Sequence, residues 1–516
     1  MQRDGACTSL WQSNMPAYPS PAKPIPQEVV DVLIVGGGIT GITTALLLQK
    51  AGKKCIVAEA NTLCFGTTGG TTAHLNTVFD HPYNELKSSF GEKAAQTIAE
   101  AAKEALDLIR QNIAQYNIDC EFEEQDGYMY SQEKKQTTEL ESILEATREV
   151  GIDMDYSDSI PVPIEFEKAV RFTGQAKFHP AKYVYGLAKA FEEAGGIILQ
   201  GCRVTKVEEN DDLEALTRYG KIRAKEMIWA THIPPGVNLL HFRCAPYRSY
   251  AMAVKLEDEN YPEGLAYDMY DPYHYYRTQI VDGEKYLIAG GEDHKTAHEE
   301  NTSMCFDRLE AYIRKYFKIS EVSFRWSSQY FEPADGIAYI GHLPGHPERI
   351  YVATGFGGNG MTYGTISAIT LSDMIAKGES KYQEIFNPNR IKPVAGFEAF
   401  VKENADVVAH MFKSPFAGSK IKELTELAHG EARVVKYEGH RIALYKNEQG
   451  KVYAVNPTCP HAKCSVAWNT AEKSWDCPCH GSRFAADGKL LCGPSMSDLQ
   501  DVELGEVEEV KGGKGR

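Results

Sequence analysis

The sequence predicts a two-part chain, in which a large α/β domain is followed by a small all-β domain. Residues 31–59 contain a β-branched apolar run, a glycine turn, an amphipathic helix and a second short strand, which is the order of a βαβ unit. Residues 245–292 are rich in strand-forming aromatic side chains. Residues 432–457 consist of short strand-like runs broken by EG and EQG turns, a pattern typical of a small β domain.

Other segments complete these two domains. Apolar residues at helical or strand spacing predict further elements, and residues 336–376 return to a glycine-rich strand, turn and helix. Beyond residue 377 the periodicity fades into a linker that contains two prolines. We expect helices over 91–115, 137–149, 178–196 and near 397–412, and strands over 198–209 and 221–232.

Composition and charge exclude some classes of partner. With 55 Lys and Arg against 71 Asp and Glu the net charge is −16, which repels phosphate backbones, so we expect no nucleic-acid partner. The most apolar stretch, residues 29–49, is interrupted by three glycines and by Asp31, so no membrane span is expected. Residues 1–28 carry several prolines and no basic-then-apolar run. They predict a loose arm rather than a signal peptide, and hence a cytoplasmic protein.

The glycine turn GGGITG, residues 36–41, fits the GxGxxG pattern of a dinucleotide-binding βαβ unit. Gly36 permits the tight turn, Gly38 lets a pyrophosphate approach the helix N-terminus, and Gly41 allows close packing. Glu59, at the end of the next strand, can accept hydrogen bonds from ribose hydroxyls. The turn alone leaves NAD and FAD open.

Four cysteines and two histidines crowd together in CPHAKC, residues 459–464, and CPCHGS, residues 477–482. Thiolate sulfur and imidazole nitrogen are the ligands that soft or borderline metals prefer, and two such loops can converge on one site. A zinc ribbon would use four of the six side chains. Two of the six Cys and His side chains would then have no role in binding the metal.

All six positions resemble the Rieske iron–sulfur domain, in which one iron takes two cysteines and the other takes two histidines. GPS, residues 493–495, resembles the proline loop that covers the cluster in that family. The resemblance assigns the inner iron to Cys459 and Cys477, the outer iron to His461 and His480, and a disulfide between the two loops to Cys464 and Cys479.

The same resemblance suggests how the cluster is tuned. Hydrogen bonds to the sulfur atoms raise the reduction potential of such clusters. Ser482 stands where the family has a donating serine, but Phe484 stands where high-potential members place a tyrosine hydroxyl. One donor is missing, so we expect a potential below that of the respiratory Rieske proteins.

A second resemblance decides between the dinucleotides. YVATGFGGNGMTYGTISA, residues 351–368, preceded by PADGIAYIG, residues 333–341, resembles the C-terminal flavin-binding segment of the D-amino-acid oxidase and glycine oxidase superfamily. GTTGGTTAH, residues 66–74, matches the segment that wraps the pyrophosphate and the ring edge. The resemblance implies FAD as cofactor, with contacts from Thr67, Thr68, Val204, Gly355, Gly357, Gly358, Met361 and Thr362.

The two resemblances together divide the chain and imply its activity. The expected parts are an N-terminal arm (1–28), an α/β FAD-binding oxidoreductase (29–380) with an interleaved mixed-sheet substrate part (about 245–330), a linker and helix (381–421), an all-β Rieske domain with a [2Fe–2S] cluster (422–510) and a tail (511–516). We expect FAD to oxidise a small amine, amino acid or hydroxy acid. Electrons would then pass singly through the cluster to an external protein or quinone.

Three other arrangements fit the same motifs. An external donor could feed electrons through the cluster to FAD. The C-terminal domain could also be a structural or redox-sensing module on an oxygen-using oxidase, or a zinc-bearing interaction module.

Substrate-binding residues are less well defined by the sequence. Oxidases of this superfamily often carry a carboxylate-binding arginine just before the DG motif, but here Tyr330 stands there. Arg277 could supply a carboxylate grip instead, or form a surface or interdomain salt bridge. His74 and His274 are expected to be core histidines. The tyrosines near Arg277 are expected to pack in a sheet, or to shape an apolar pocket.

Overall fold

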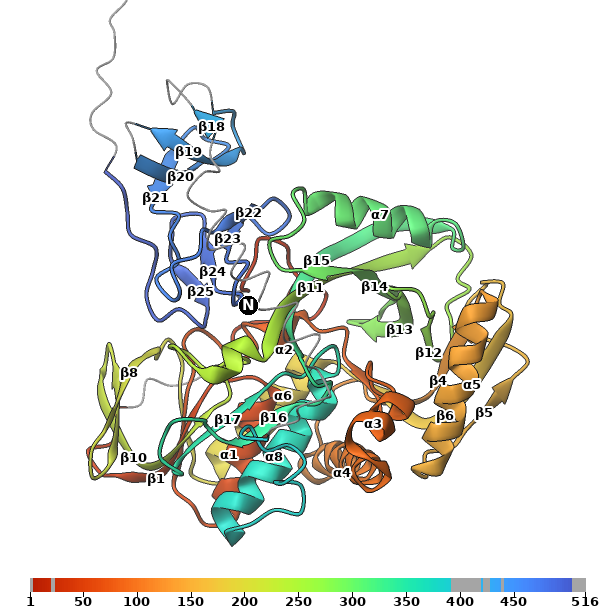
Figure 1. The fold of residues 1–516 in the computed structure, drawn as a ribbon, viewed down its shortest axis with the longest axis horizontal. Helices are drawn as coiled ribbons and strands as arrows, with labels where there is room; N and C mark the ends of the chain where they lie inside the picture. Colours follow the sequence, from red (N-terminus) through yellow and green to blue (C-terminus); the bar gives the residue numbers. More distant parts are fainter. Residues whose placement is uncertain (1–2, 20–23, 391–418, 421–426, 438–439, 504–516) are drawn as a thin grey trace, which may run out of the picture.

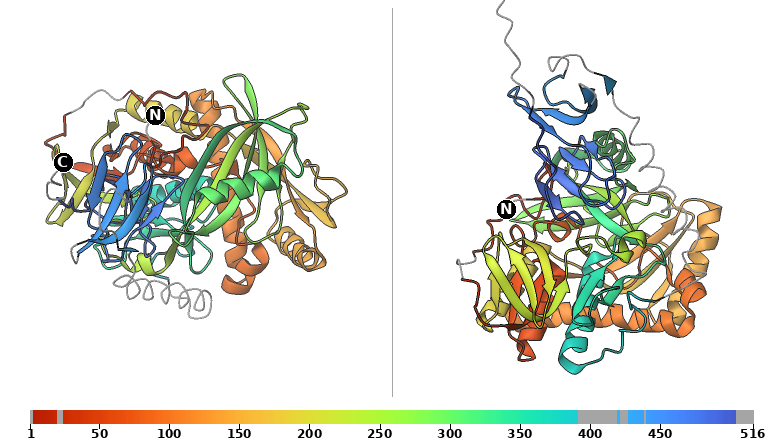
Figure 2. Two further views of the ribbon diagram at one scale, coloured as in Figure 1. Left: turned by 90° about the horizontal axis from the view of Figure 1, so that it is seen from above. Right: turned by 60° about the vertical axis from the view of Figure 1, so that its left-hand side comes forward.

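A computed structural model of the protein describes residues 3–19, 24–390, 419–420, 427–437 and 440–503. An α/β body fills the larger part of the molecule, and the C-terminal domain, drawn in blue, projects from one side of it (Figures 1 and 2). The helix expected near 397–412 and the tail 511–516 lie outside the described residues. Within the described ranges, no helix combines the length and the apolar character that crossing a bilayer requires.

An eight-stranded mixed sheet forms the nucleotide-binding half of the body. Strand β1 (Val30–Val35), helix α1 (Ile39–Lys50) and strand β2 (Cys55–Ala58) follow one another, and β1 pairs in parallel with β2, so the predicted βαβ unit is confirmed. The strand order is β16-β17-β10-β1-β2-β7, with β8 and β9 attached beside β10. The other strands of this sheet are β7 (Ile197–Leu199), β8 (Val204–Glu209), β9 (Leu213–Thr217), β10 (Gly220–Trp229), β16 (Tyr339–His342) and β17 (Ile350–Thr354).

A nine-stranded sheet forms the other half, as the aromatic strand-rich section predicted. Its order is β15-β11-β14-β13-β12-β4-β6-β3, and β5 pairs with β6. All of its pairings are antiparallel except that of β12 with β4. Its strands are β3 (His74–Leu75), β4 (Glu123–Ser131), β5 (Met154–Ser157), β6 (Lys168–Lys177), β11 (Cys244–Leu256), β12 (Leu265–Tyr267), β13 (Tyr275–Val281), β14 (Glu284–Lys295) and β15 (Ile319–Pro333).

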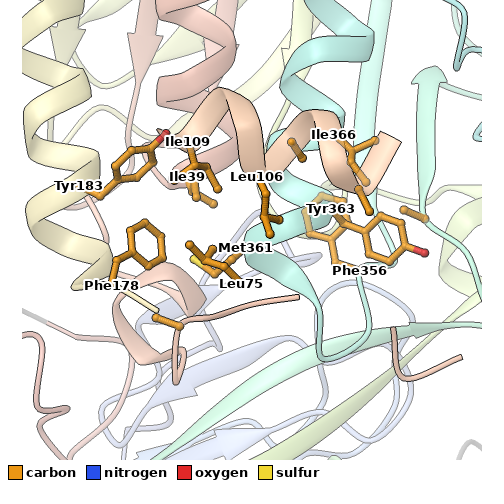
Figure 3. Close-up of a cluster of buried hydrophobic side chains, with 14 of the residues drawn as sticks. Ile39, Leu75, Leu106, Ile109, Phe178, Tyr183, Phe356, Met361, Tyr363 and Ile366 are labelled. Atoms are coloured by element: carbon orange, nitrogen blue, oxygen red, sulfur yellow. The ribbon is translucent and has the colours of Figure 1, made fainter. Parts of the chain in front are cut away.

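Helices pack against these sheets and enclose the main hydrophobic core. Figure 3 shows Ile39 of α1, Ile109 of α4 and Ile366 of α8 directed into one buried cluster. The first residues of α1 and α8, Ile39 and Gly360, both line the cavity described below. The helices besides α1 are α2 (Thr67–Gly70), α3 (Tyr83–Phe90), α4 (Glu92–Tyr116), α5 (Lys134–Glu149), α6 (Pro180–Glu193), α7 (Ser303–Ile313) and α8 (Gly360–Lys377), with a 3₁₀ turn, η1, at Leu239–Phe242.

The C-terminal domain contains two small sheets. One has the order β18-β19-β20-β21 and the other β22-β23-β24-β25. Trp475 and Phe484 are fully buried and share a core with the domain's metal-site cysteines. Its strands are β18 (Ser419–Lys420), β19 (Ala432–Tyr437), β20 (His440–Lys446), β21 (Val452–Val455), β22 (Ala467–Asn469), β23 (Ser474–Asp476), β24 (Arg483–Ala485) and β25 (Leu490–Cys492).

The N-terminal segment, residues 3–19, is packed into the molecule, so the expectation of a loose arm is wrong for this segment. Leu10 and Trp11 are buried, and the Trp11 indole N–H donates to the Thr71 carbonyl. Arg3 lies 3.0 Å from Glu472 of the C-terminal domain. The segment therefore lies where the α/β body meets the C-terminal domain (Figure 1).

Candidate functional site

The turn between β1 and α1 forms one wall of a cavity of about 290 Å³, which we call the central cavity. Gly36 has φ +118°, and a Cβ atom there would lie 2.3 Å from the Ala230 carbonyl oxygen. A Cβ atom at Gly41 would lie 2.0 Å from the Gly36 carbonyl oxygen. The glycines therefore let α1 start close to β1, with its N-terminus at the cavity, the arrangement that favours a pyrophosphate.

We expect Gly41→Ala to abolish FAD binding and to lower the free energy of unfolding by about 2–3 kcal/mol, because the new methyl group meets rigid backbone. The measurement is the FAD content of the purified protein together with its denaturant midpoint. Gly52→Ala is the control, since Gly52 closes the other end of the same helix and nothing lies within 4 Å of a Cβ atom there, although its φ is +87°. It should lose about 1 kcal/mol and keep its FAD. Full FAD content in Gly41→Ala would contradict the expectation.

Glu59 lies at the end of β2 and lines the cavity. Its carboxylate accepts hydrogen bonds from the backbone N–H groups of Gly37 and Asn61, each at 2.7 Å. Burial raises the pKa of Glu59, although these N–H groups oppose the rise. The position is the one expected of a ribose acceptor.

Most of the predicted FAD residues converge on this cavity, although they come from five separate segments. Three of them, Gly41, Gly355 and Thr362, do not line the cavity but lie next to residues that do. The Thr362 hydroxyl donates to the carbonyl of Asn76, a lining residue. The lining members of the predicted set are Gly36, Gly38, Glu59, Thr67, Thr68, Val204, Gly357, Gly358 and Met361.

Arg277 does not lie in the central cavity. Its fully buried guanidinium donates to the carbonyls of Thr72 and Ala73 at 2.8 and 2.6 Å, and to the Gln279 side chain. No carboxylate partner of Arg277 is present within the described residues, so neither the carboxylate grip nor the salt bridge matches its surroundings. Arg277 instead holds the backbone just before β3, next to Thr72 and His74, which line the cavity.

The C-terminal domain and the N-terminal segment close the same cavity. Its lining includes Asp4 of the N-terminal segment and residues Leu491, Cys492, Gly493, Ser495 and Met496 of the C-terminal domain. The loop that contains Gly493 and Ser495, which resembles the proline loop that covers the cluster in Rieske domains, therefore also faces the central cavity.

The predicted metal ligands come together between two loops of the C-terminal domain. The Cys477 thiol donates to the Cys459 sulfur, which lowers the pKa of Cys459 to about 7. The rings of His461 and His480 lie with their centroids 4.9 Å apart. A disulfide joins Cys464 and Cys479, as the resemblance implied. Because these two sulfurs bond to each other, Cys459, Cys477, His461 and His480 remain as the side chains that could hold a metal.

Both histidines are in the state that binds metal. Burial lowers the pKa of His480 to about 4 and also lowers the pKa of His461, so both imidazoles are neutral near pH 7. The Gly236 carbonyl lies 3.0 Å from Nε2 of His461 and can only accept, so Nε2 carries the proton and Nδ1 is left with its lone pair. Nδ1 of His461 and both ring nitrogens of His480 are buried without a partner within the described residues. These side chains fit a [2Fe–2S] cluster.

The α/β body contacts the histidine edge of this site directly. Gly236 accepts from His461 and donates from its N–H to the Pro494 carbonyl at 3.0 Å. The His241 ring lies 4.7 Å from the His461 ring. Hydrogen bonds at both nitrogens, with the backbone of Asn238 and Pro234, fix the neutral His241 ring in place.

The fold and the site together define a flavin-dependent oxidoreductase that carries an iron–sulfur domain. Family models match in the same order: "FAD dependent oxidoreductase" over residues 31–374 and "Rieske [2Fe-2S] domain" over residues 419–503. The chain belongs to the family of FAD-dependent oxidoreductases and has a C-terminal Rieske domain, so its cofactors are FAD and a [2Fe–2S] cluster.

Individual relatives agree with this assignment. The chain is 34% identical over 501 residues to the Rieske 2Fe-2S iron-sulfur protein YhfW of Bacillus subtilis, covering 96% of this chain and 97% of that one. It is 23% identical to the gamma-glutamylputrescine oxidoreductase of Escherichia coli, covering 69% of this chain and 86% of that one. The crystal structure of glycine oxidase from Geobacillus kaustophilus has the same fold, with a TM-score of 0.59 at 15% identity, covering 71% of this chain and all of that one.

Two groups of site residues were missed by the sequence analysis. Asp80 and Asp293 line the cavity but stand in no motif. Gly236 and His241, which meet the cluster histidines, lie in a loop with no recognisable pattern. Nothing in a single sequence marks such positions, since only the tertiary fold brings them to the site.

The predicted tuning of the cluster can be tested at Phe484, which is fully buried beside the ligand cysteines. Ser482 donates to the Cys459 sulfur, as the resemblance implied. We expect Phe484→Tyr to raise the midpoint potential by on the order of 50 mV, because an added hydroxyl donor stabilises the reduced cluster. Redox titration followed by electron paramagnetic resonance measures it. Phe484→Leu, which adds no donor, should not raise the potential, and an unchanged potential in Phe484→Tyr would contradict the tuning argument.

Proposed function

We propose that this protein oxidises a small substrate in the central cavity and passes the electrons through its Rieske domain to an external one-electron acceptor, a protein or a quinone. When bound, FAD supplies two-electron oxidation and the cluster supplies single-electron transfer. One observation carries the proposal: the ligand His461 donates to Gly236 of the α/β body, and the adjacent 491–496 loop lines the cavity. The two redox sites are thus joined by one contact surface.

The residues of the chain itself prepare this surface. The Gly236 carbonyl holds the His461 tautomer, and His241 packs against both cluster histidines. The 491–496 loop lines the cavity, and its Pro494 carbonyl accepts from the Gly236 N–H beside the metal site. We propose that the substrate has an oxidisable C–N bond. The similarity to gamma-glutamylputrescine oxidoreductase supports this, because the compound in that name carries an amine.

The test is anaerobic mixing of the holoenzyme with amines, amino acids and hydroxy acids while the flavin absorbance and the cluster resonance are recorded. We expect the flavin absorbance to bleach first and the low-g signal of a reduced Rieske cluster to follow. The extent of cluster reduction should increase with the extent of flavin bleaching. The full-length variant Cys477→Ser should still bleach but should no longer reduce an external acceptor.

Two outcomes would replace the proposal. Undiminished turnover with oxygen in Cys477→Ser would assign the Rieske domain a structural or sensing role. Reduction of the cluster by an external donor before any flavin change would reverse the direction of electron flow.

A further inference from the structure

The two ends of the central cavity differ in their chemistry. Of the described residues that line it, one is an arginine, Arg203, and none is a lysine. Arg203 lies at the end that Glu59 and Val204 form. It donates to the Leu490 carbonyl at 3.0 Å, and its positive charge opposes the rise in the pKa of Glu59. The other end, which we call the acid–tyrosine end, is lined by Asp80, Asp293, Tyr267, Tyr273, Tyr275 and Tyr330.

Neither carboxylate of the acid–tyrosine end has a lysine or arginine partner among the described residues. Asp293 accepts from the Tyr330 hydroxyl at 3.0 Å through Oδ2, and the Ser249 hydroxyl is its other side-chain donor. Asp80 accepts from the Tyr273 hydroxyl at 3.2 Å and from the Gly358 N–H at 2.9 Å. Hydroxyl and N–H donors hold both groups in place but leave their charge unneutralised.

The nearby histidine cations are already engaged elsewhere. His81 lies 2.8 Å from Glu332, and His274 lies 2.9 Å from Asp268. Each of these two histidines also has a second carboxylate within 4 Å, Glu85 for His81 and Glu292 for His274. Counting these acids, the surroundings of Asp80 and Asp293 remain negative.

Burial destabilises the charged form of the Asp80 and Asp293 carboxylates when no counterion is present. It raises the pKa of Asp293 to about 7 and the pKa of Asp80 to about 6, and the Asp80 charge adds to the rise at Asp293. A cation placed between the two carboxylates would relieve both effects. A substrate carboxylate placed there would increase them.

The tyrosine rings suit the same kind of ligand. The rings of Tyr273 and Tyr275 lie 5.7 Å apart, and every hydroxyl of the set is hydrogen bonded, Tyr267 to Asn76 at 3.0 Å and Tyr275 to Ser249 at 3.2 Å. Aromatic rings that are held in place by hydrogen bonds attract alkylammonium groups through the ring quadrupole, and neighbouring carboxylates add to this attraction.

We infer that the substrate carries an organic ammonium group, which Asp293 and Asp80 bind as counterions at the acid–tyrosine end of the central cavity. This inference rests on the proposed function for the existence of a substrate, and it adds the substrate's charge class. It also assigns a specificity role to Tyr330, whose hydroxyl orients Asp293.

Binding of non-oxidisable probes tests the inference without turnover. The holoenzyme is titrated with benzyltrimethylammonium, benzoate and benzyl alcohol, and binding is followed by calorimetry and by the shift of the flavin spectrum. We expect the cation to bind at least tenfold more tightly than benzoate. Asp293→Asn and Asp80→Asn should each weaken cation binding by tenfold or more and should leave benzoate binding unchanged or stronger.

Glu85→Gln is the matched control, because it removes one negative charge from a partner of His81 outside the cavity. It should change cation binding less than twofold. Benzoate binding more tightly than the cation, or cation affinity within twofold of wild type in both aspartate variants, would overturn the inference. FAD and cluster contents are measured in every sample, so Asp-dependent cation binding in a protein that couples no substrate to its cluster would refute the proposed function alone.

Discussion

Replacement of Cys477 by serine is expected to remove the iron–sulfur cluster and to leave FAD bound. Cys477 is buried in the core of the Rieske domain, next to its fellow ligand Cys459. Serine is a far poorer ligand for iron than thiolate, and a site lacking one of four ligands loses most of its affinity. The glycine turn and the 355–362 segment, which belong to the α/β body, are unaffected.

The measurements are iron and acid-labile sulfide content, the low-g resonance of the reduced protein and the flavin absorbance. Cys492→Ser is the control, since Cys492 lies in the same domain but outside the Cys2His2 group. It should keep full iron and sulfide. A Cys477→Ser protein with wild-type iron, sulfide and resonance would show that the ligand assignment is wrong.

The second large effect is expected at Glu472, which joins three parts of the chain. Its fully buried carboxylate lies 3.0 Å from Arg3, 3.9 Å from Arg248 and accepts from the Ser327 N–H at 2.8 Å. Glu472→Gln keeps the size, but its amide NH2 cannot accept the hydrogen bond that the second carboxylate oxygen takes from the Cys7 N–H, and two buried arginines are left short of a counter-charge. We expect the free energy of unfolding to fall by about 3 kcal/mol.

Acid should have a similar effect on the wild-type protein. Burial by itself would raise the pKa of Glu472, but Arg3, Arg248 and Arg483 hold it down to about 2. A depressed carboxylate pKa contributes stability that is fully present above the unfolded value of 4.5 and is lost as pH falls from there towards 2, at most about 3 kcal/mol. Denaturant unfolding between pH 7 and pH 3 should show the part of this loss that falls above pH 3, about 2 kcal/mol, and Glu472→Gln should flatten it.

Glu448→Gln serves as control, because Glu448 is exposed in the same domain. Its free energy of unfolding should stay within about 0.5 kcal/mol of wild type at every pH. Equal pH profiles for wild type and Glu472→Gln would mean that the arginines find other partners when Glu472 is neutral.

The parts of the site that the sequence predicted are those in which function depends on short local spacing. Gly36, Gly38 and Gly41 lie on one turn, and Cys459 and His461 lie two positions apart, so chain geometry alone brings them together. Asp80 and Asp293 are separated by more than two hundred residues and meet only because β14 and the segment before α3 reach the same cavity. The domain boundaries at 380 and 422 stay predictions.

The N-terminal segment shows why a local pattern can mislead. Its prolines and lack of periodicity are correctly read as irregular chain, but irregular chain can still be buried if partners satisfy its polar groups. Arg3 and Asp4 find such partners in Glu472 and Arg483, far along the sequence. Arg277 illustrates the converse, since a cation in a strand was expected at a ligand or on the surface and instead binds backbone carbonyls.

The ion pair between Arg3 and Glu472 joins residues that are 469 positions apart in the sequence. This separation sets an order for folding during synthesis on the ribosome. Arg3 cannot reach its final position until Glu472 has been synthesised. The contacts through which Asp4 closes the central cavity therefore form only after the strands of the C-terminal domain have been synthesised.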